Sequence, residues 1–105
     1  MRLPVTDTVS IYQFVRSGDT ESYNTTPAYT NINACITPTG TDIVPSGEAA
    51  AFQLFEIFLY DVTLTIHNAD KIVNQNGTQY IVDGMPFVIN NQYLRYIRLL
   101  GRQVV

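Results

Sequence analysis

Branched and aromatic residues recur along the chain in short runs, and clusters of Gly, Pro, Asn, Asp and Ser separate these runs. Runs of this kind favour β-strands, and the polar clusters between them are typical of turns. The pattern therefore predicts an all-β fold, a small single-domain β-barrel or sandwich with long polar loops.

Two strands are expected in the N-terminal half, over residues 8–16 and 28–37. The first alternates imperfectly, whereas the second has a continuous apolar face. That face consists of Ala28, Thr30, Ile32, Ala34 and Ile36. Pro38 is expected to close the second strand because proline cannot donate to a β-ladder. Residues 17–27 and 39–47 are rich in polar residues, glycine and proline, so both are expected to be exposed loops, the first of them mobile.

Residues 52–60 are apolar on both faces of an extended chain, which is typical of a central strand or of one packed against a neighbouring subunit. A helix that begins at Ser46 is the alternative, because serine caps helices and residues 49–51 are alanines. The apolar positions show no helical stripe, so the strand is favoured.

Residues 71–102 read as a hairpin followed by further strands. Asn76-Gly77 supplies the two positive φ angles that a tight turn needs, between strands at 71–75 and 78–82. The remaining elements are a turn at Asp83–Pro86, a short strand at 87–89, a turn at 90–92, and a last strand at 93–100 that Gly101 ends.

Composition supports one domain over residues 1–105 with a protein partner. Hydrophobic residues make up 46% of the chain and charged residues only 14%. That leaves less surface charge than a solitary soluble protein usually carries, so part of the surface is expected to meet other proteins. The net charge of −3 excludes a generally basic nucleic-acid binder. Neither a signal sequence nor a long apolar run is evident, so we expect synthesis in a reducing cytoplasm and no membrane association.

Residues that could carry chemistry are few and scattered. His67 has no adjacent motif that would orient it as a base, and the single cysteine, Cys35, lies on an apolar strand without a basic neighbour. The nine acidic residues are dispersed, so the convergent oxygen ligands of a calcium or magnesium loop are missing. We expect no enzyme activity, no metal and no cofactor.

Basic and aromatic residues alternate near the C-terminus, where Arg95, Arg98 and Arg102 follow Tyr93 and surround Tyr96. Such a mixture on a small barrel can bind single-stranded nucleic acid. Arg95 and Arg98 would, however, point to opposite faces of one strand, which disfavours a continuous phosphate track. An oligonucleotide-binding barrel is therefore an alternative function.

The C-terminal half resembles the head-closure proteins of tailed bacteriophages, also called stoppers or head–tail joining proteins. The resemblance covers about residues 52–102, and its pattern is an acidic residue before a strand, a turn into a Tyr-x-Val strand, a Gly-x-Pro turn and a last strand with aromatic and basic residues. The matching segments are Phe55–Leu59, Asp70–Val73, Gly77–Pro86 and Tyr96–Leu100. The N-terminal half matches nothing comparable.

The resemblance implies a virion structural protein at the head–tail junction. Such a protein self-associates in a ring below the portal and adaptor proteins, closes the capsid near its packaged DNA and docks the tail proteins. A tail-terminator ring is a second structural alternative. Contacts with partners are expected in the two loops and on the last strand. The residues assigned to them are Asp19, Glu21, Tyr23, Asp42, Arg95, Tyr96 and Arg98. Simple solvent-exposed connections are the alternative for the loops.

Overall fold

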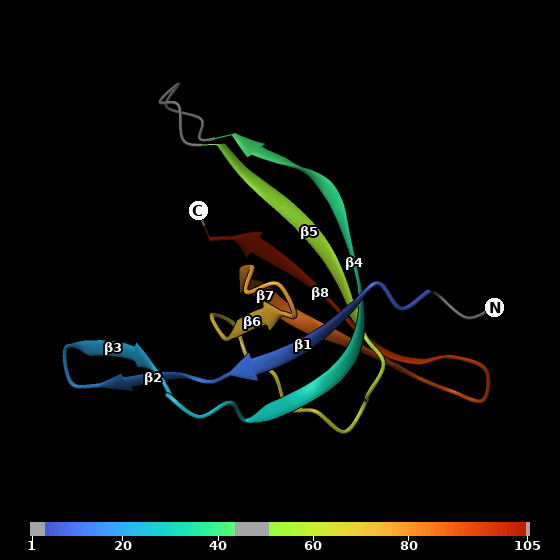
Figure 1. Ribbon diagram of the computed structural model, residues 1–105, viewed down its shortest axis with the longest axis horizontal. Helices are drawn as coiled ribbons and strands as arrows, with labels where there is room; N and C mark the ends of the chain where they lie inside the picture. The colour runs from blue at the N-terminus through green and yellow to red at the C-terminus, as the bar shows by residue number, and fades with distance from the viewer. Residues whose placement is uncertain (1–3, 44–50, 105) are drawn as a thin grey trace.

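A computed structural model describes residues 4–43 and 51–104. Six strands close into an antiparallel barrel in the order β1-β4-β5-β8-β7-β6, with β1 paired to β6, and β2 and β3 form a separate hairpin (Figure 1). The described residues contain no helix, and so none that could cross a membrane. The all-β prediction is confirmed, in its barrel form. The strands are β1 (Asp7–Tyr12), β2 (Phe14–Ser17), β3 (Thr20–Tyr23), β4 (Tyr29–Ile43), β5 (Ala51–Leu59), β6 (Lys71–Asn74), β7 (Gln79–Asn90) and β8 (Arg95–Gln103).

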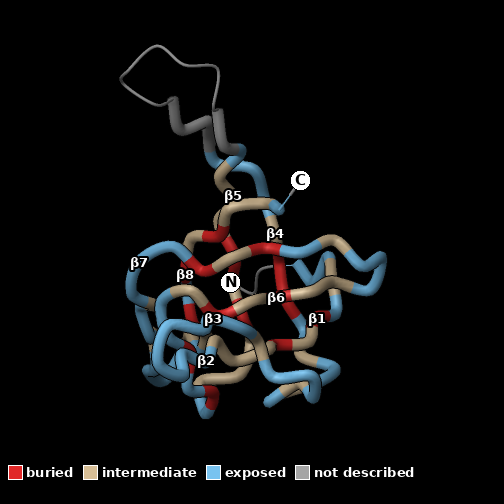
Figure 2. The backbone as a smooth tube through the Cα atoms, turned by 90° about the vertical axis from the view of Figure 1, so that its left-hand side faces the viewer, coloured by how far each residue is buried: buried red, intermediate tan, exposed pale blue. Residues whose placement is uncertain are grey.

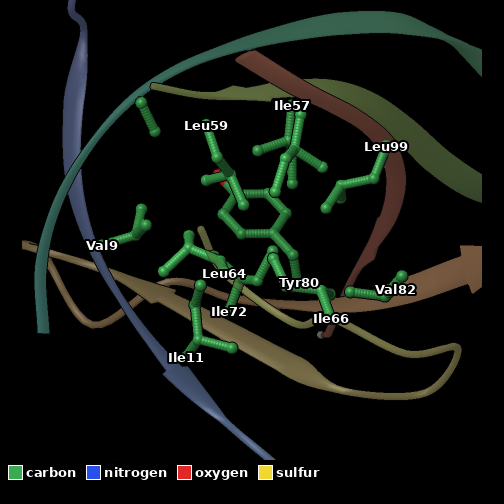
Figure 3. Close-up of a cluster of buried hydrophobic side chains, with 12 residues drawn as sticks. Val9, Ile11, Ile57, Leu59, Leu64, Ile66, Ile72, Tyr80, Val82 and Leu99 are labelled. Carbon is green, nitrogen blue, oxygen red and sulfur yellow. The ribbon is translucent and has the colours of Figure 1, made fainter. Parts of the chain in front are cut away.

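The core lies inside the barrel, where every second side chain of each strand points inward. Figure 2 shows the buried segments gathered in the body of the barrel, and Figure 3 shows their side chains directed toward one another. Leu64 and Ile66, from the connection between β5 and β6, join this cluster. The fully buried members are Val9, Ile11, Ala34, Ile57, Leu59, Ile72, Val82, Ile97 and Leu99.

β5 confirms the strand that was expected at 52–60. It lies between β4 and β8, with Ile57 and Leu59 buried inside the barrel. On its outer side, Phe58 meets the ring of Tyr96 edge to face at 5.3 Å. Both faces of β5 are apolar because each packs against side chains of this chain. The alternative helix start, Ser46, lies outside the described residues.

A β-bulge changes the predicted apolar face of β4. Val9 pairs with Ile32 and Ile11 with Tyr29, so β4 has one more residue than β1 over this stretch. Asn31, at φ 56°, takes up the extra residue. The side-chain alternation therefore shifts here, and Tyr29 packs against the core in place of Ala28 and Thr30.

The prediction that Pro38 closes this strand was wrong. β4 continues to Ile43, and a second bulge lies between the pairs Pro38–Phe55 and Gly40–Leu54. Pro38 is tolerated because it sits at the bulge and beyond the segment that pairs with β1, where no partner needs its N–H. The loop expected at 39–47 is thus strand up to residue 43, and the rest of it lies outside the described residues.

The loop expected at 17–27 is in part a hairpin. The first expected strand breaks at Gln13, and β2 then pairs with β3 around a turn where Gly18 has φ 61°. Phe14 and Tyr23 meet edge to face at 5.6 Å on one face of this hairpin. The sequence pattern did not predict this hairpin because its two strands are short and mostly polar. Residues 24–28 form the irregular connection to β4.

Two turns in the C-terminal half differ from prediction. The Asn76-Gly77 hairpin exists, but only Gly77 has positive φ, and the Gly77 N–H donates to the carbonyl of Asn74. Together with the Asn74–Thr78 bond, this makes a three-residue loop in place of a two-residue one. Asp83–Pro86 is a bulge inside β7, where β7 has two more residues than β8 between the pairs Asp83–Leu100 and Phe87–Arg98. Gly84, at φ 90°, permits it.

Gly101 does not end the last strand, because β8 runs on to Gln103. A Cβ at this position would lie 2.9 Å from Ile57 Cδ1 and 3.2 Å from Tyr80 Cβ. Glycine is needed here for the close approach of neighbouring strands, and its backbone stays extended.

Gly101→Ala is therefore expected to destabilise the fold by about 1–3 kcal/mol through overpacking, as measured by denaturant unfolding. Adding Ile57→Val removes the closest atom, so the double variant should lose less than the two single losses combined. If the loss in the double variant equals the sum of the two single losses, the contact with Ile57 is not the cause.

Candidate protein–protein interface

The ends of β7 and β8 extend beyond the barrel as a hairpin of their own. β7 last pairs with β6 at Ile81, and β8 last pairs with β5 at Ile97. We call residues 85–96 the β7–β8 arm. Ile89 and Asn90 in it pair with Tyr96 and Arg95, while Phe87 and Val88 at its base lie opposite Arg98 and Ile97 of the barrel wall. Figure 1 shows the arm projecting past the barrel at the right. The outer edges of the arm pair with no other strand among the described residues, so its surface is open to a partner.

Large apolar side chains on the arm face solvent. Met85 is 90% exposed, Tyr93 is 82% exposed, and Phe87 and Val88 are each more than half exposed. Single exposed apolar residues are ordinary, but four on one short hairpin are a local concentration of apolar surface of the kind that binds other proteins. Among the exposed large hydrophobic residues elsewhere are Val5, Val15 and Val104, which lie apart from the arm in the sequence.

Local hydrogen bonds fix the tip of the arm. The Asn91 side chain accepts from the backbone N–H groups of Tyr93 and Leu94 at 2.8 Å each, and the Asn91 N–H donates to the carbonyl of Leu94. At the base, the Gly84 N–H donates to Asn68 Oδ1. The arm therefore presents its side chains from an ordered backbone, which lowers the entropy lost on binding.

The three residues of the last strand that the sequence assigned to partner contacts differ in how accessible they are to a partner. Arg98 is held on the outer wall by Glu56, with Nε and Nη2 at 2.8 and 2.6 Å from the same carboxylate oxygen. Tyr96 packs on Phe58 beside it. Arg95 is exposed near the tip, and it forms no ion pair with any described residue. Because the Arg98 charge is compensated, a continuous basic track for nucleic acid is not assembled here.

The residues assigned to the two loops are not brought together. Glu21 forms an ion pair with Arg16 across the β2–β3 hairpin, and Asp19 is exposed in its turn. Asp42 lies opposite Phe52 in the β4–β5 ladder, and its side chain lies outside the described residues. Tyr23 is turned toward the barrel.

Tyr23 fastens the β2–β3 hairpin to the barrel. Its hydroxyl donates to the carbonyl of Ala69 at 2.8 Å, and Lys71 Nζ lies 4.8 Å from its ring centre, a cation–π distance. Burial raises the pKa of Tyr23 above 10.0, and the nearby Asp70 carboxylate raises it further by a smaller amount. This tyrosine is consequently a structural contact of the hairpin.

That raised pKa predicts alkaline loosening of the hairpin. The Tyr23 contribution to stability is complete below pH 10.0 and is lost as the pH rises through the higher folded pKa, because the phenolate cannot donate. We expect the thermal midpoint to fall over this range, and Tyr23→Phe to remove part of the slope. Tyr80, whose pKa is raised chiefly by burial, should contribute to the slope that remains. An identical slope in the Tyr23→Phe variant would contradict this account.

A buried carboxylate holds the hairpin from the other side. Asp70 is 2% exposed, and its two oxygens accept the backbone N–H groups of Phe14 and His67 at 2.9 Å each. The His67 ring is largely exposed, with Nδ1 4.0 Å from Asp70 Oδ2. A shallow hollow is lined by Gln13, Phe14, His67, Asn68 and Asp70. Since both carboxylate oxygens are occupied by backbone donors, Asp70 acts as a clamp between hairpin and barrel.

Cys35 is buried and unbridged. No group of three or more His, Cys, Asp or Glu side chains gathers within residues 4–43 and 51–104. The expectation that the chain is not an enzyme stays a prediction.

Sequence reasoning missed the apolar part of the interface. It assigned Arg95, Tyr96 and Arg98 but not Met85, Phe87 and Val88. The available signal was an apolar run, Met85–Ile89, between a glycine and the polar turn at 90–92. From the sequence alone, an exposed strand with this composition cannot be distinguished from a buried strand.

These features define a class, a small closed antiparallel barrel that carries protruding hairpins. No protein-family model matches the chain, and no curated protein sequence matches it. A solved structure with a similar fold is the phage-like element PBSX protein xkdH from Bacillus subtilis. The similarity has a TM-score of 0.63 at 15% sequence identity, and it covers 92% of each chain. The two proteins share the fold over nearly their whole length.

Proposed function

We propose that this chain is a structural protein of a tailed bacteriophage or phage-like particle, located at the head–tail junction. There it forms a ring below the portal and adaptor proteins, closes the DNA-filled head and docks the tail. Two findings support this: the fold shared with a PBSX protein over 92% of both chains, and the resemblance of residues 52–102 to head-closure proteins.

The β7–β8 arm carries the proposal. It presents Met85, Phe87, Val88 and Tyr93 to solvent on a hairpin that the barrel does not need for its own closure. Leaving that surface in water is unfavourable, and a protein partner that covers it recovers about 25 cal/mol for each Å² of apolar area. A function based on assembly accounts for this arm, whereas a solitary barrel gives it no role.

Ring assembly places a further demand on the surface. Repeated head-to-tail contacts require two different and complementary patches on each subunit, and they close when the rotation between subunits fits. The hairpins that project from opposite sides of the barrel give each subunit two different surfaces for such contacts (Figure 1).

Mixing the chain with the portal and adaptor proteins of the same particle tests the proposal. Light scattering should show little self-association of the isolated chain and a complex larger than any component in the mixture. If no such complex forms, the head–tail junction is the wrong location. Binding to the tail tube in its place would point to a tail-terminator ring.

A further inference from the structure

The β2–β3 hairpin and the β7–β8 arm lie at opposite ends of the molecule. Figure 1, drawn with the longest axis horizontal, shows the hairpin at the left and the arm at the right. The longest extent is 44 Å, so the two cannot meet within one copy. Any contact between them joins two copies, and it leaves a free hairpin and a free arm at the ends of the pair.

The two ends carry opposite charge. The hairpin has one net negative charge, because it contains Arg16, Asp19 and Glu21. Arg16 pairs with Glu21, and Asp19 has no ion-pair partner among the described residues. The arm carries Arg95, which is likewise unpaired within the described part of the chain. Opposite charges at facing ends of neighbouring copies orient the encounter and disfavour the reversed arrangement.

The two ends also differ in side-chain size. The pairs Val15–Ser22 and Ser17–Thr20 place small side chains on the hairpin face that is turned away from the Phe14–Tyr23 ring pair. Val15 on this face is 36% exposed. The arm presents large side chains, among them Phe87 and Tyr93. A small-residue face can receive bulky side chains without rearrangement, which good shape complementarity requires.

We propose that the β7–β8 arm of one copy docks on the β2–β3 hairpin of the next, with Arg95 facing Asp19 and the apolar arm residues against the Val15 face. The inference rests on the proposed function for the arm as an interface, and it names the occupant: a second copy of this chain. Such a contact is heterologous, so it propagates from copy to copy and can close as a ring.

Mixed cysteine variants test the contact directly. Asp19→Cys and Arg95→Cys are prepared separately, each combined with Cys35→Ala to remove the native thiol. After mild oxidation at high protein concentration, the mixture should yield a disulfide-linked pair that contains one chain of each kind. Neither variant alone should cross-link. Equal cross-linking within one variant, or none in the mixture, would overturn the proposal.

Charge exchange provides a second readout. At the high protein concentration used for cross-linking, Asp19→Arg and Arg95→Asp should each weaken self-association by about fivefold, as expected for a single exposed pair, and the two combined in one chain should restore it. A double variant as weak as either single one would overturn the pairing.

The outcomes separate this inference from the proposed function. If the chain joins the portal and adaptor proteins but no mixed cross-link forms, the arm contacts another protein and only this inference fails. If the mixed cross-link forms while no larger complex with those proteins appears, the self-contact stands and the head–tail location fails.

Discussion

Replacing Asp70 by asparagine is expected to lower the free energy of unfolding by about 2–4 kcal/mol. The buried carboxylate accepts the N–H groups of Phe14 and His67, and an amide offers only one acceptor oxygen in the same place. One buried donor is then left facing an NH₂ group. Chemical denaturation should show the loss, and hydrogen exchange should show faster exchange at the Phe14 amide.

Asp83→Asn is the matched control, because it makes the same chemical change at an exposed position of β7. Its effect should stay within about 0.5 kcal/mol of the unsubstituted protein. Equal effects of the two substitutions would show that Asp70 does not clamp the hairpin to the barrel.

Replacing both Phe87 and Tyr93 by serine is expected to weaken assembly with the portal and adaptor proteins several-hundredfold, with little change in stability. Aromatic residues at the centre of an interface often contribute 2 kcal/mol or more each to binding. Both side chains are mostly exposed in the isolated chain, so the fold does not depend on them. Light scattering of the mixture and thermal unfolding of the variant alone measure the two effects.

Val5→Ser combined with Val104→Ser is the control for the arm. These side chains are also exposed, at 48% and 45%, but they lie outside the arm. The control should bind as the unsubstituted protein does. If the control and the arm variant lose binding equally, general surface hydrophobicity, and not the arm, is responsible.

The fold class could be predicted because strand composition and turn residues are local signals. The hairpin at residues 71–82 and the strand at 52–60 were found this way. The errors fall where a barrel departs from a regular ladder. Pro38 and Gly84 looked like strand ends, yet each lies in a bulge, and Gly101 lies inside β8. Bulges bend strands so that the sheet can close, and this requirement is set by tertiary structure.

The candidate interface was predictable only in part. Arg95 and Tyr96 were placed on a partner-binding strand, and they do lie on the arm. Whether Phe87 is buried or exposed depends on where β6 stops pairing with β7, which no local pattern reveals. Tyr23 looked like a loop contact, but its role follows from the Ala69 carbonyl, 46 positions away.

Electron microscopy of the particle encoded alongside this chain tests the central claim most directly. We predict density for the barrel in a ring between the portal complex and the tail, with each β7–β8 arm covered by a neighbouring protein. A particle that lacks the chain, or a map in which the arms point into open solvent, would contradict it.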